Sequence, residues 1–291
     1  MSKPLILLTG CFGQLGTAIQ RRWDAASLSA DYDLLPVDAS QLDLTDAPDV
    51  RAYLDQLKPR YVINTAAYTQ VDNAESDSEA AFALNGDAVS VLARWCSKND
   101  CTLIQISTDF VFDGQADSPY LPEAATGPLS VYGASKLAGE HHVRDRLPHN
   151  GIIVRTAWLY SEFASNFVKT MLRLETERDT VDVVDDQVGQ PTYAADLAAQ
   201  IAALVDARPA AGIFHGTNSG TVSWNGFTRE IFRLMGADPE RVRAVTSEQF
   251  VRPAPRPAYS VLGHARWADI GLPPMRDWRS AIAEAMERGF D

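Results

Sequence analysis

Pro4-Leu5-Ile6-Leu7-Leu8-Thr9 runs directly into Gly10-Cys11-Phe12-Gly13-Gln14-Leu15-Gly16 near the start of the chain. The apolar run does not alternate with polar residues, which is typical of a parallel strand buried on both faces. Three glycines spaced three residues apart follow it, and a helical pattern begins at Thr17. Glycines in such a turn allow a tight reversal and a close approach of backbone to a pyrophosphate. The stretch therefore predicts a dinucleotide site, in which the N–H groups of the helix start face the anion.

The glycine spacing leaves one alternative open. It is Gly-x-x-Gly-x-x-Gly rather than the commoner Gly-x-Gly-x-x-Gly, and a tight β–α turn occurs in many α/β proteins that bind no cofactor. The order of strand, glycines and helix favours the cofactor.

Composition and charge limit the class of protein. The chain has 291 residues, 46% apolar content and a formal net charge of −12. This charge, without a concentrated basic patch, argues against a nucleic-acid partner but not against an anionic small molecule. No stretch has the pattern of a signal peptide or the length of a membrane span. We therefore expect a cytoplasmic protein with no nucleic-acid partner and no membrane partner.

The cysteines and histidines do not indicate a metal site. Cys11, Cys96 and Cys101 form no C-x-x-C pair, and the five histidines form no H-E-x-x-H grouping. We expect packing thiols and no metal held by protein ligands.

Strand and helix patterns alternate over most of the chain and predict an α/β fold with a Rossmann-type doubly wound parallel sheet. We expect residues 1–178 to form the NAD(P)-binding domain, with the sheet completed by a strand near 213–215. Residues 179–291 should form mainly a smaller α/β lobe that binds the substrate. The predicted strands are 4–9, 33–38, 61–67, 102–106, 151–155 and 180–184, and the predicted helices begin near 17, 47, 78, 130, 166, 194, 224 and 278.

Two strand ends indicate how a dinucleotide would lie. Asp38 follows the second strand, where an acidic residue accepts hydrogen bonds from an adenosine ribose. No arginine follows it closely, so a 2′-phosphate would lack a partner and NADH is favoured, although a solvated loop aspartate remains an alternative. Small residues after the third strand, Ala66 and Ala67, would let a flat ligand lie against backbone. A polar loop follows from Tyr68 to Asp77, and Asn85 in the next helix is either structural or part of the site.

A tyrosine and a lysine four residues apart, Tyr132 and Lys136, share one face of a predicted helix. A nearby ammonium would lower the pKa of the Tyr132 phenol and so suit it to proton transfer at neutral pH. Thr108, at the end of the fourth strand, adds a hydroxyl that would hold a substrate carbonyl beside the phenol. Tyr132 would then protonate the oxygen as hydride reaches the carbonyl carbon. On its own a Tyr-x-x-x-Lys pair more often covers a helix surface.

Together these features resemble the extended short-chain dehydrogenase/reductase family and, within it, the dTDP-4-dehydrorhamnose reductase family. The similarity covers nearly the whole chain. It lies in Gly10-x-x-Gly13-Gln14-Leu15-Gly16, Asn64-Thr65-Ala66-Ala67-Tyr68-Thr69-x-Val71-Asp72-x-Ala74-Glu75, Ser107-Thr108-Asp109-Phe110-Val111-Phe112-x-Gly114, Val131-Tyr132-Gly133-x-Ser135-Lys136-Leu137-x-Gly139-Glu140, Arg155-Thr156-Ala157-Trp158-Leu159-Tyr160, Asn166 to Met171, Asp186-Gln187-x-Gly189-x-Pro191-Thr192 and Arg256-Pro257.

The resemblance implies an activity and roles for particular residues. It implies reduction of dTDP-4-dehydro-6-deoxy-L-mannose to dTDP-L-rhamnose with NADPH or NADH. A homodimer is compatible with the resemblance. Catalysis would fall to Thr108, Tyr132 and Lys136. The cofactor would contact Gly10, Phe12, Gly13, Gln14, Leu15, Gly16, Asp38, Asp43, Leu44, Ala66, Ala67, Tyr68, Tyr132 and Lys136. The substrate would contact Thr108, Asp109, Trp158, Asn166 and Arg256, the last two at the diphosphate. For Asn166 and Arg256, a helix cap and a surface arginine remain the alternatives.

Two positions depart from the family pattern. Ala18 stands where some members have a glutamate that holds magnesium between subunits, so we expect no metal here. Phe110 stands where tyrosine is usual, which removes one hydroxyl near the site.

Other functions were weighed against this one from the sequence. A 4,6-dehydratase is disfavoured, because Phe110 rather than a second carboxylate follows Asp109. Another nucleotide-sugar 4-ketoreductase or an epimerase of the same family is harder to exclude. A regulatory subunit that binds dinucleotide without turnover is the non-enzymatic alternative, although it would not need Thr108, Tyr132 and Lys136 together.

Overall fold

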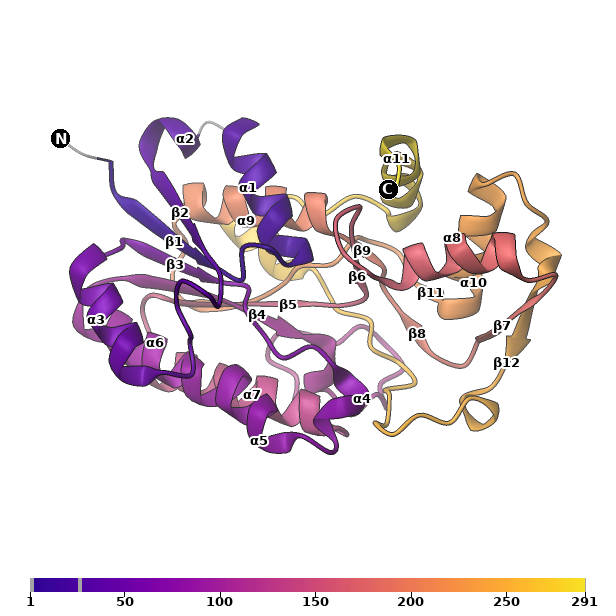
Figure 1. Cartoon of the computed structure of the whole chain (residues 1–291), viewed down its shortest axis with the longest axis horizontal. Coiled ribbons are helices and arrows are strands. Elements are labelled where there is room, and N and C mark those ends of the chain that lie inside the picture. Colours follow the sequence, from indigo (N-terminus) through magenta and orange to yellow (C-terminus); the bar gives the residue numbers. More distant parts are fainter. Residues whose placement is uncertain (1–2, 26–27, 291) are drawn as a thin grey trace.

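A computed structural model of the chain describes residues 3–25 and 28–290. Within these residues, six parallel strands form the main sheet in the order β2-β1-β3-β4-β5-β10. This arrangement confirms the predicted Rossmann-type α/β class (Figure 1). The strands are β1 (Leu5–Thr9), β2 (Asp33–Val37), β3 (Tyr61–Asn64), β4 (Thr102–Thr108), β5 (Gly151–Thr156) and β10 (Gly212–His215). The direction of strand order reverses between β1 and β3, and open α/β sheets bind ligands at the carboxyl ends beside such a reversal.

The β1 side chains alternate between the two hydrophobic cores of the main domain. Ile6 and Leu8 pack with Trp23 of α1 in one core, while Leu7 packs with Leu92 of α6 in the other. Helices α1 (Gln14–Ala25) and α9 (Ala194–Ala207) cover the first face, and α3 (Ala47–Leu57), α6 (Ala88–Lys98) and α7 (Val131–Arg146) cover the second (Figure 1). Each fully buried leucine contributes about 2 kcal/mol. The glycine turn is therefore anchored to a rigid strand.

Strand β2 explains the proline in its sequence. It pairs in parallel with β1, with Pro36 opposite Leu8, and lies at the edge of the sheet. Proline lacks the N–H group that a central strand would need for its second neighbour. The edge position accommodates it.

The segment between β3 and β4 is more helical than its sequence indicates. The predicted polar loop contains a short helix, α4 (Val71–Ala74). The sequence does not indicate it, because a single helical turn is too short to show a periodic pattern of apolar residues. The long helix expected next consists of α5 (Ser78–Phe82), a π-helical turn η1 (Ala83–Asp87) and α6. A Cβ atom on Gly139 of α7 would lie 2.3 Å from the Asn85 carbonyl oxygen. This glycine lets α7 pack directly against the π turn.

The later part of the chain forms a smaller lobe beside the main sheet (Figure 1), and this lobe has a hydrophobic core of its own. Tyr160, Phe227 and Trp278 are among its buried side chains. The remaining elements are α2 (Leu28–Asp31), η2 (Asp109–Val111), β6 (Leu159–Tyr160), α8 (Phe167–Glu177), β7 (Val181–Val184), β8 (Val188–Gly189), β9 (Thr192–Tyr193), β11 (Val222–Ser223), α10 (Trp224–Leu234), η3 (Pro239–Arg241), β12 (Val242–Val245), η4 (Ser247–Gln249), η5 (Ala265–Ile270) and α11 (Trp278–Arg288). The division at residue 178 stays a prediction; beyond it, α9 packs on α1 and β10 pairs with β5.

Across the described ranges, the helices are too short or too polar to cross a membrane.

Candidate functional site

The glycine turn shows why small residues are needed after β1. Gly10 has φ +69°, and a Cβ atom there would lie 2.6 Å from the backbone nitrogen of Ala66. A Cβ atom on Gly16 would lie 2.3 Å from the Gly10 oxygen. Gly13 differs, because a Cβ atom there would meet only the Gly10 oxygen within 4 Å while the residue lines a cavity. Its missing side chain leaves room for a ligand, as a dinucleotide pyrophosphate requires.

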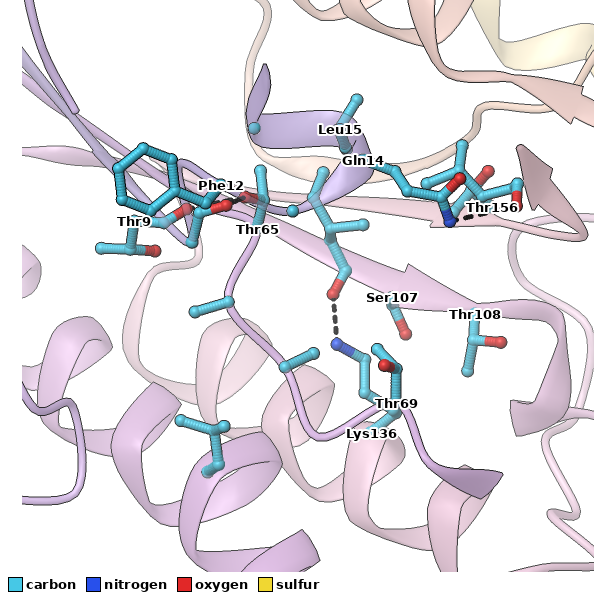
Figure 2. Close-up of a pocket in the computed structure, with 18 of the residues that line it drawn as sticks. Thr9, Phe12, Gln14, Leu15, Thr65, Thr69, Ser107, Thr108, Lys136 and Thr156 are labelled. Carbon is cyan, nitrogen blue, oxygen red and sulfur yellow. Dashed lines mark hydrogen bonds between the residues drawn. The ribbon is translucent and has the colours of Figure 1, made fainter. Parts of the chain in front are cut away.

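This cavity, here called the dinucleotide cleft, has a volume of about 700 Å³ and runs along the carboxyl ends of the strands (Figure 2). Its size lies in the range of small-molecule sites. Most residues predicted for the site line it, namely Gly10, Phe12, Gly13, Gln14, Leu15, Gly16, Asp38, Asp43, Leu44, Ala66, Ala67, Thr108, Asp109, Tyr132, Lys136 and Trp158. Tyr68, Asn166 and Arg256 lie outside this lining.

One end of the cleft carries carboxylates. Asp38 Oδ1 accepts hydrogen bonds from Ser40 N at 2.8 Å and Ser40 Oγ at 2.6 Å, and these bonds hold the pKa of Asp38 below its usual value. A hydrogen bond from the Thr45 hydroxyl likewise lowers the pKa of Asp43. Phe12, 74% exposed, lines the same cleft. Lys136 is the one cation among the described residues of this lining, so a 2′-phosphate would meet acidic side chains.

The other end brings Thr108 and Tyr132 together. Thr108 ends β4, and Tyr132 lies in the first turn of α7, which begins after Ser130; the Ser130 hydroxyl accepts a hydrogen bond from Gly133 N at 3.1 Å. A Cβ atom on Gly133 would lie 2.2 Å from the Phe110 oxygen, so glycine permits the contact between this turn and the strand end. The Thr108 hydroxyl lies close enough to the Tyr132 phenol to favour its charged form, and both residues line the cleft. A carbonyl oxygen placed beside this pair would meet two hydroxyl groups.

The expected lowering of the Tyr132 pKa is wrong for this structure. Burial raises the pKa of Tyr132 to about 12, and the nearby Asp109 adds to the increase, while the nearby Thr108 hydroxyl opposes it. Burial disfavours the charged phenolate more than the neighbouring groups stabilise it. The phenol therefore keeps its proton at neutral pH, as a proton donor in a reduction must.

Lys136 points to backbone in this structure. Its Nζ donates to the carbonyl oxygen of Ile106 at 2.7 Å, which Figure 2 marks with a dashed line. Burial lowers the pKa of Lys136 to about 8, and the charge of Glu140 opposes that shift. The ammonium is thus held beside the strand end that carries Thr108, one helical turn from Tyr132.

A polar ladder that sequence reasoning missed supports this end of the cleft. Thr9, Asn64 and Gln105 lie in register on β1, β3 and β4, and all are at most 2% exposed. Thr9 Oγ1 donates to Asn64 Oδ1 at 2.6 Å, and Asn64 Nδ2 donates to Gln105 Oε1 at 2.7 Å. Gln105 Nε2 then donates to the Ile106 oxygen, the same atom that holds Lys136. Polar residues within otherwise apolar strands were the signal that could have revealed it.

Asp109 is a buried carboxyl beside Thr108. It is 1% exposed, and its Oδ1 accepts from Thr108 Oγ1 at 3.0 Å. Burial raises the pKa of Asp109 to about 6, and the nearby Ser260 hydroxyl and the hydrogen bond from Thr108 oppose this increase. This carboxyl therefore changes charge close to neutral pH.

A second cavity of about 500 Å³, here called the lobe cavity, adjoins the cleft. The two share Asp109, Phe110 and Trp158 in their linings. The lobe cavity is otherwise lined by aromatic, aliphatic and basic residues that include Phe167, Met171, Val183, Trp224, Arg252 and Arg256. A ligand could extend from Thr108 and Tyr132 into this cavity.

The arginine predicted to meet a diphosphate is paired in this structure. Arg256 Nη1 and Nη2 donate to the two carboxylate oxygens of Asp72 at 2.6 and 3.0 Å. This pairing holds the pKa of Asp72 below its usual value. Asp72 belongs to α4 on the main domain, so the pair joins the two sides of the molecule. The contact of Arg256 with substrate stays a prediction.

Asn166 and Asn85 both form hydrogen bonds with backbone groups. Asn166 caps α8 by accepting from Lys169 N at 3.1 Å, and it donates to Gln14 Oε1 at 3.1 Å. Asn85 accepts from Tyr68 N at 2.9 Å and donates to Tyr68 O at 3.0 Å. These bonds fix the loop that presents Ala66 and Ala67 to the cleft, while the Tyr68 phenol turns toward Asp77. Ligand contacts of Asn166 and Tyr68 stay predictions.

Comparison with known proteins agrees with this geometry. The model of the family described as RmlD substrate binding domain matches residues 4–290. The chain belongs to this family. It is similar to a dTDP-4-dehydrorhamnose reductase of Streptomyces griseus, with 46% identity over 97% of this chain and 93% of that protein.

Two further proteins are similar to this chain over nearly its whole length. A dTDP-4-keto-6-deoxy-D-glucose reductase of Streptomyces niveus is 45% identical over 96% of this chain and 95% of that protein. The crystal structure of dTDP-4-dehydrorhamnose reductase from Bacillus anthracis in complex with NADP superposes with a TM-score of 0.92. It is 35% identical and covers 99% of this chain and 100% of that one.

A metal site was not expected in this member of the RmlD family. Ala18, which stands where some family members have a metal-binding glutamate, is buried in the core. Within residues 3–25 and 28–290, no three histidine, cysteine, aspartate or glutamate side chains cluster in a way that could hold a metal ion.

Proposed function

We propose that the protein reduces the 4-keto group of dTDP-4-dehydro-6-deoxy-L-mannose to give dTDP-L-rhamnose, with NADPH or NADH as reductant. The observation that carries this is the meeting of Thr108, Tyr132 and Lys136 in the cleft beside the glycine turn, next to a second cavity large enough for part of a nucleotide sugar. The names of the Streptomyces griseus and Bacillus anthracis relatives support it.

The residues divide the work as follows. The reduced nicotinamide cofactor, when bound, supplies hydride to the carbonyl carbon. Thr108 orients the carbonyl oxygen, and Tyr132, protonated at neutral pH, donates the proton that this oxygen needs as its charge develops. Lys136, held at the Ile106 oxygen, lies one helical turn away, where an ammonium stabilises the phenolate that remains.

The glycine turn and the carboxylates would hold the cofactor. Gly10 and Gly16 permit the close backbone contacts of the turn, and Gly13 leaves the first turn of α1 open to the pyrophosphate. Asp38 would accept hydrogen bonds from the adenosine ribose. Because Asp38 and Asp43 would repel a 2′-phosphate, we expect NADH to be used at least as well as NADPH.

A second candidate is a 4-ketoreductase for another dTDP-sugar. It is favoured by the Streptomyces niveus relative, which has nearly the same identity to this chain and is named for a different sugar. An assay that resolves products tests both, with several dTDP-4-keto-6-deoxy sugars each supplied with NADH and with NADPH. Formation of dTDP-L-rhamnose at the highest kcat/KM supports the first proposal, and another product supports the second. Absence of oxidation of either cofactor would favour a non-catalytic subunit.

The homodimer and the cytoplasmic location expected from sequence also stay proposals. Light scattering of the purified chain and cell fractionation test them directly.

A further inference from the structure

The Trp158 indole stands where the cleft and the lobe cavity meet, and its backbone is unusual. It lines both cavities together with Asp109 and Phe110. Its φ angle is +46°, in the left-handed region that residues with a side chain rarely adopt. Such a conformation persists only where surrounding contacts hold it.

One of these contacts comes from the lobe. The Trp158 and Trp224 rings stack with their centroids 3.5 Å apart and their planes 10° from parallel. Trp224 is the first residue of α10, whose start is fixed by the Ser223 hydroxyl, which accepts from Gly226 N at 3.0 Å. Phe167 packs on Trp224 with centroids 4.3 Å apart. The indole of Trp158 thus ends a row of aromatic rings anchored on two helices.

A glycine provides the second contact. A Cβ atom on Gly189 would lie 2.7 Å from both Cε2 and Cζ2 of Trp158, so no larger residue fits without moving the indole. Gly189 pairs with Val222 in the β8–β11 sheet, two residues before Trp224. The β8–β11 pairing therefore ties Gly189 to the segment that leads into Trp224. In addition, Thr192 N donates to the Trp158 oxygen at 3.2 Å.

We propose that Trp224 and Gly189 are positioning residues for the sugar nucleotide, and that they act by holding the Trp158 indole in the wall between the two cavities. This inference rests on the proposed function. A released indole would turn into one cavity or the other and obstruct the path from the lobe cavity to Thr108. The cofactor end of the cleft, more distant along the sheet, would be unaffected.

Kinetics separate this role from general support of the fold. In Trp224→Ala we expect the KM for the dTDP-4-keto sugar to rise about tenfold, with kcat within threefold and the KM for NADH unchanged, because ground-state and transition-state binding weaken together. Trp224→Phe keeps a stacking ring and should restore a KM within threefold of wild type. Trp278→Phe, in the lobe core and stacked edge-on against Phe227, is the matched control and should leave every constant near wild type.

A second variant reaches the same indole from another residue. Gly189→Ala leaves Trp224 intact but displaces Trp158, so it should raise the same KM about tenfold. Stacked indoles also give an exciton couplet in circular dichroism, which should be lost in Trp224→Ala and retained in Trp278→Phe.

The outcomes are distinct. A wild-type protein without turnover of any dTDP-4-keto sugar defeats the proposed function. The positioning role alone is overturned if the wild type turns over the sugar and Trp224→Ala loses the couplet but keeps the wild-type KM for the dTDP-4-keto sugar. A parallel rise in the KM for NADH, or no rescue by Trp224→Phe, also overturns it.

Discussion

The dinucleotide cleft and the lobe cavity meet at Asp109, Phe110 and Trp158, yet they are built differently. The cleft is lined by residues at the ends of five neighbouring strands, β2, β1, β3, β4 and β5, many of them small. These residues come in short contiguous runs along the chain. The lobe cavity is walled by aromatic rings and arginines from separate segments, among them Phe167, Trp224 and Arg256.

The two cavities also differ in whether their charged side chains are free to bind a ligand. In the cleft, Asp38 is held by its own turn and keeps a carboxylate oxygen for a ligand. In the lobe cavity, Arg256 already pairs with Asp72 across the two sides of the molecule. If the proposed function holds, a cofactor would meet a carboxylate oxygen of Asp38 that is already available, whereas a substrate diphosphate would have to compete with Asp72 for Arg256.

The largest expected effect lies at the boundary of the two cavities. In Tyr132→Phe we expect kcat to fall about 10³-fold, because the proton donor is lost while the ring and its edge-on contact with Phe110 remain. The affinity for NADH, measured by fluorescence titration, should stay within twofold. A variant with wild-type kcat would remove Tyr132 from the mechanism.

Asp109 and Asp72 should respond to pH in opposite ways. The folded-state pKa of Asp109 is raised from 3.8 to about 6, so the folded protein retains a proton that the unfolded chain releases. Its contribution to the free energy of unfolding is therefore present below pH 4 and lost as pH rises to 6, by up to about 3 kcal/mol. The pKa of Asp72 is lowered, so its contribution is present above pH 4 and lost as pH falls.

Urea unfolding of wild type, Asp109→Asn and Asp72→Asn between pH 3 and pH 7 measures this contrast. The difference in free energy of unfolding between wild type and Asp109→Asn should shrink with rising pH. The difference between wild type and Asp72→Asn should grow. Equal slopes for the two differences would show that the two carboxyls share one environment.

Arg256→Gln tests the lobe cavity alone. We expect the KM for the sugar nucleotide to rise about thirty-fold, because a charge-assisted contact to phosphate is lost, with the KM for NADH unchanged. Arg266→Gln, an arginine outside both linings, is the matched control. Equal constants for Arg256→Gln and the control would leave Arg256 as a structural partner of Asp72.

Asp38→Asn tests the cleft alone and has the smallest expected effect. Removing the negative charge should shift the ratio of kcat/KM for NADPH to that for NADH about tenfold toward NADPH, since the 2′-phosphate no longer meets a carboxylate. Asp31→Asn, away from the cleft lining, should leave the ratio unchanged. An unaltered ratio in Asp38→Asn would place the ribose elsewhere.

The same difference explains what the sequence could predict. The cleft depends on local geometry, so the glycine turn, the Ala66-Ala67 strand end and the pair Tyr132 and Lys136 were found from spacing. The family and fold class were confirmed, and the expected reaction agrees with the names of relatives.

What could not be predicted depends on contacts between distant segments. Neither spacing nor residue type reveals that Arg256 pairs with Asp72, 184 positions away, or that Asn85 clamps Tyr68. The direction of the Tyr132 pKa shift was predicted wrongly because a sequence does not show burial, which raises this pKa. Nor does it show that the Lys136 ammonium is bound to the Ile106 carbonyl.

The central claim is that the ketone is reduced at the boundary of the two cavities, beside Thr108 and Tyr132. A crystal structure of the protein with NADH and dTDP-L-rhamnose tests it most directly. The account predicts the C4 hydroxyl within hydrogen-bond distance of both the Tyr132 and Thr108 hydroxyls, and the dTDP group in the lobe cavity. A sugar nucleotide bound with C4 away from Tyr132, in a complex that also holds the cofactor, would contradict it.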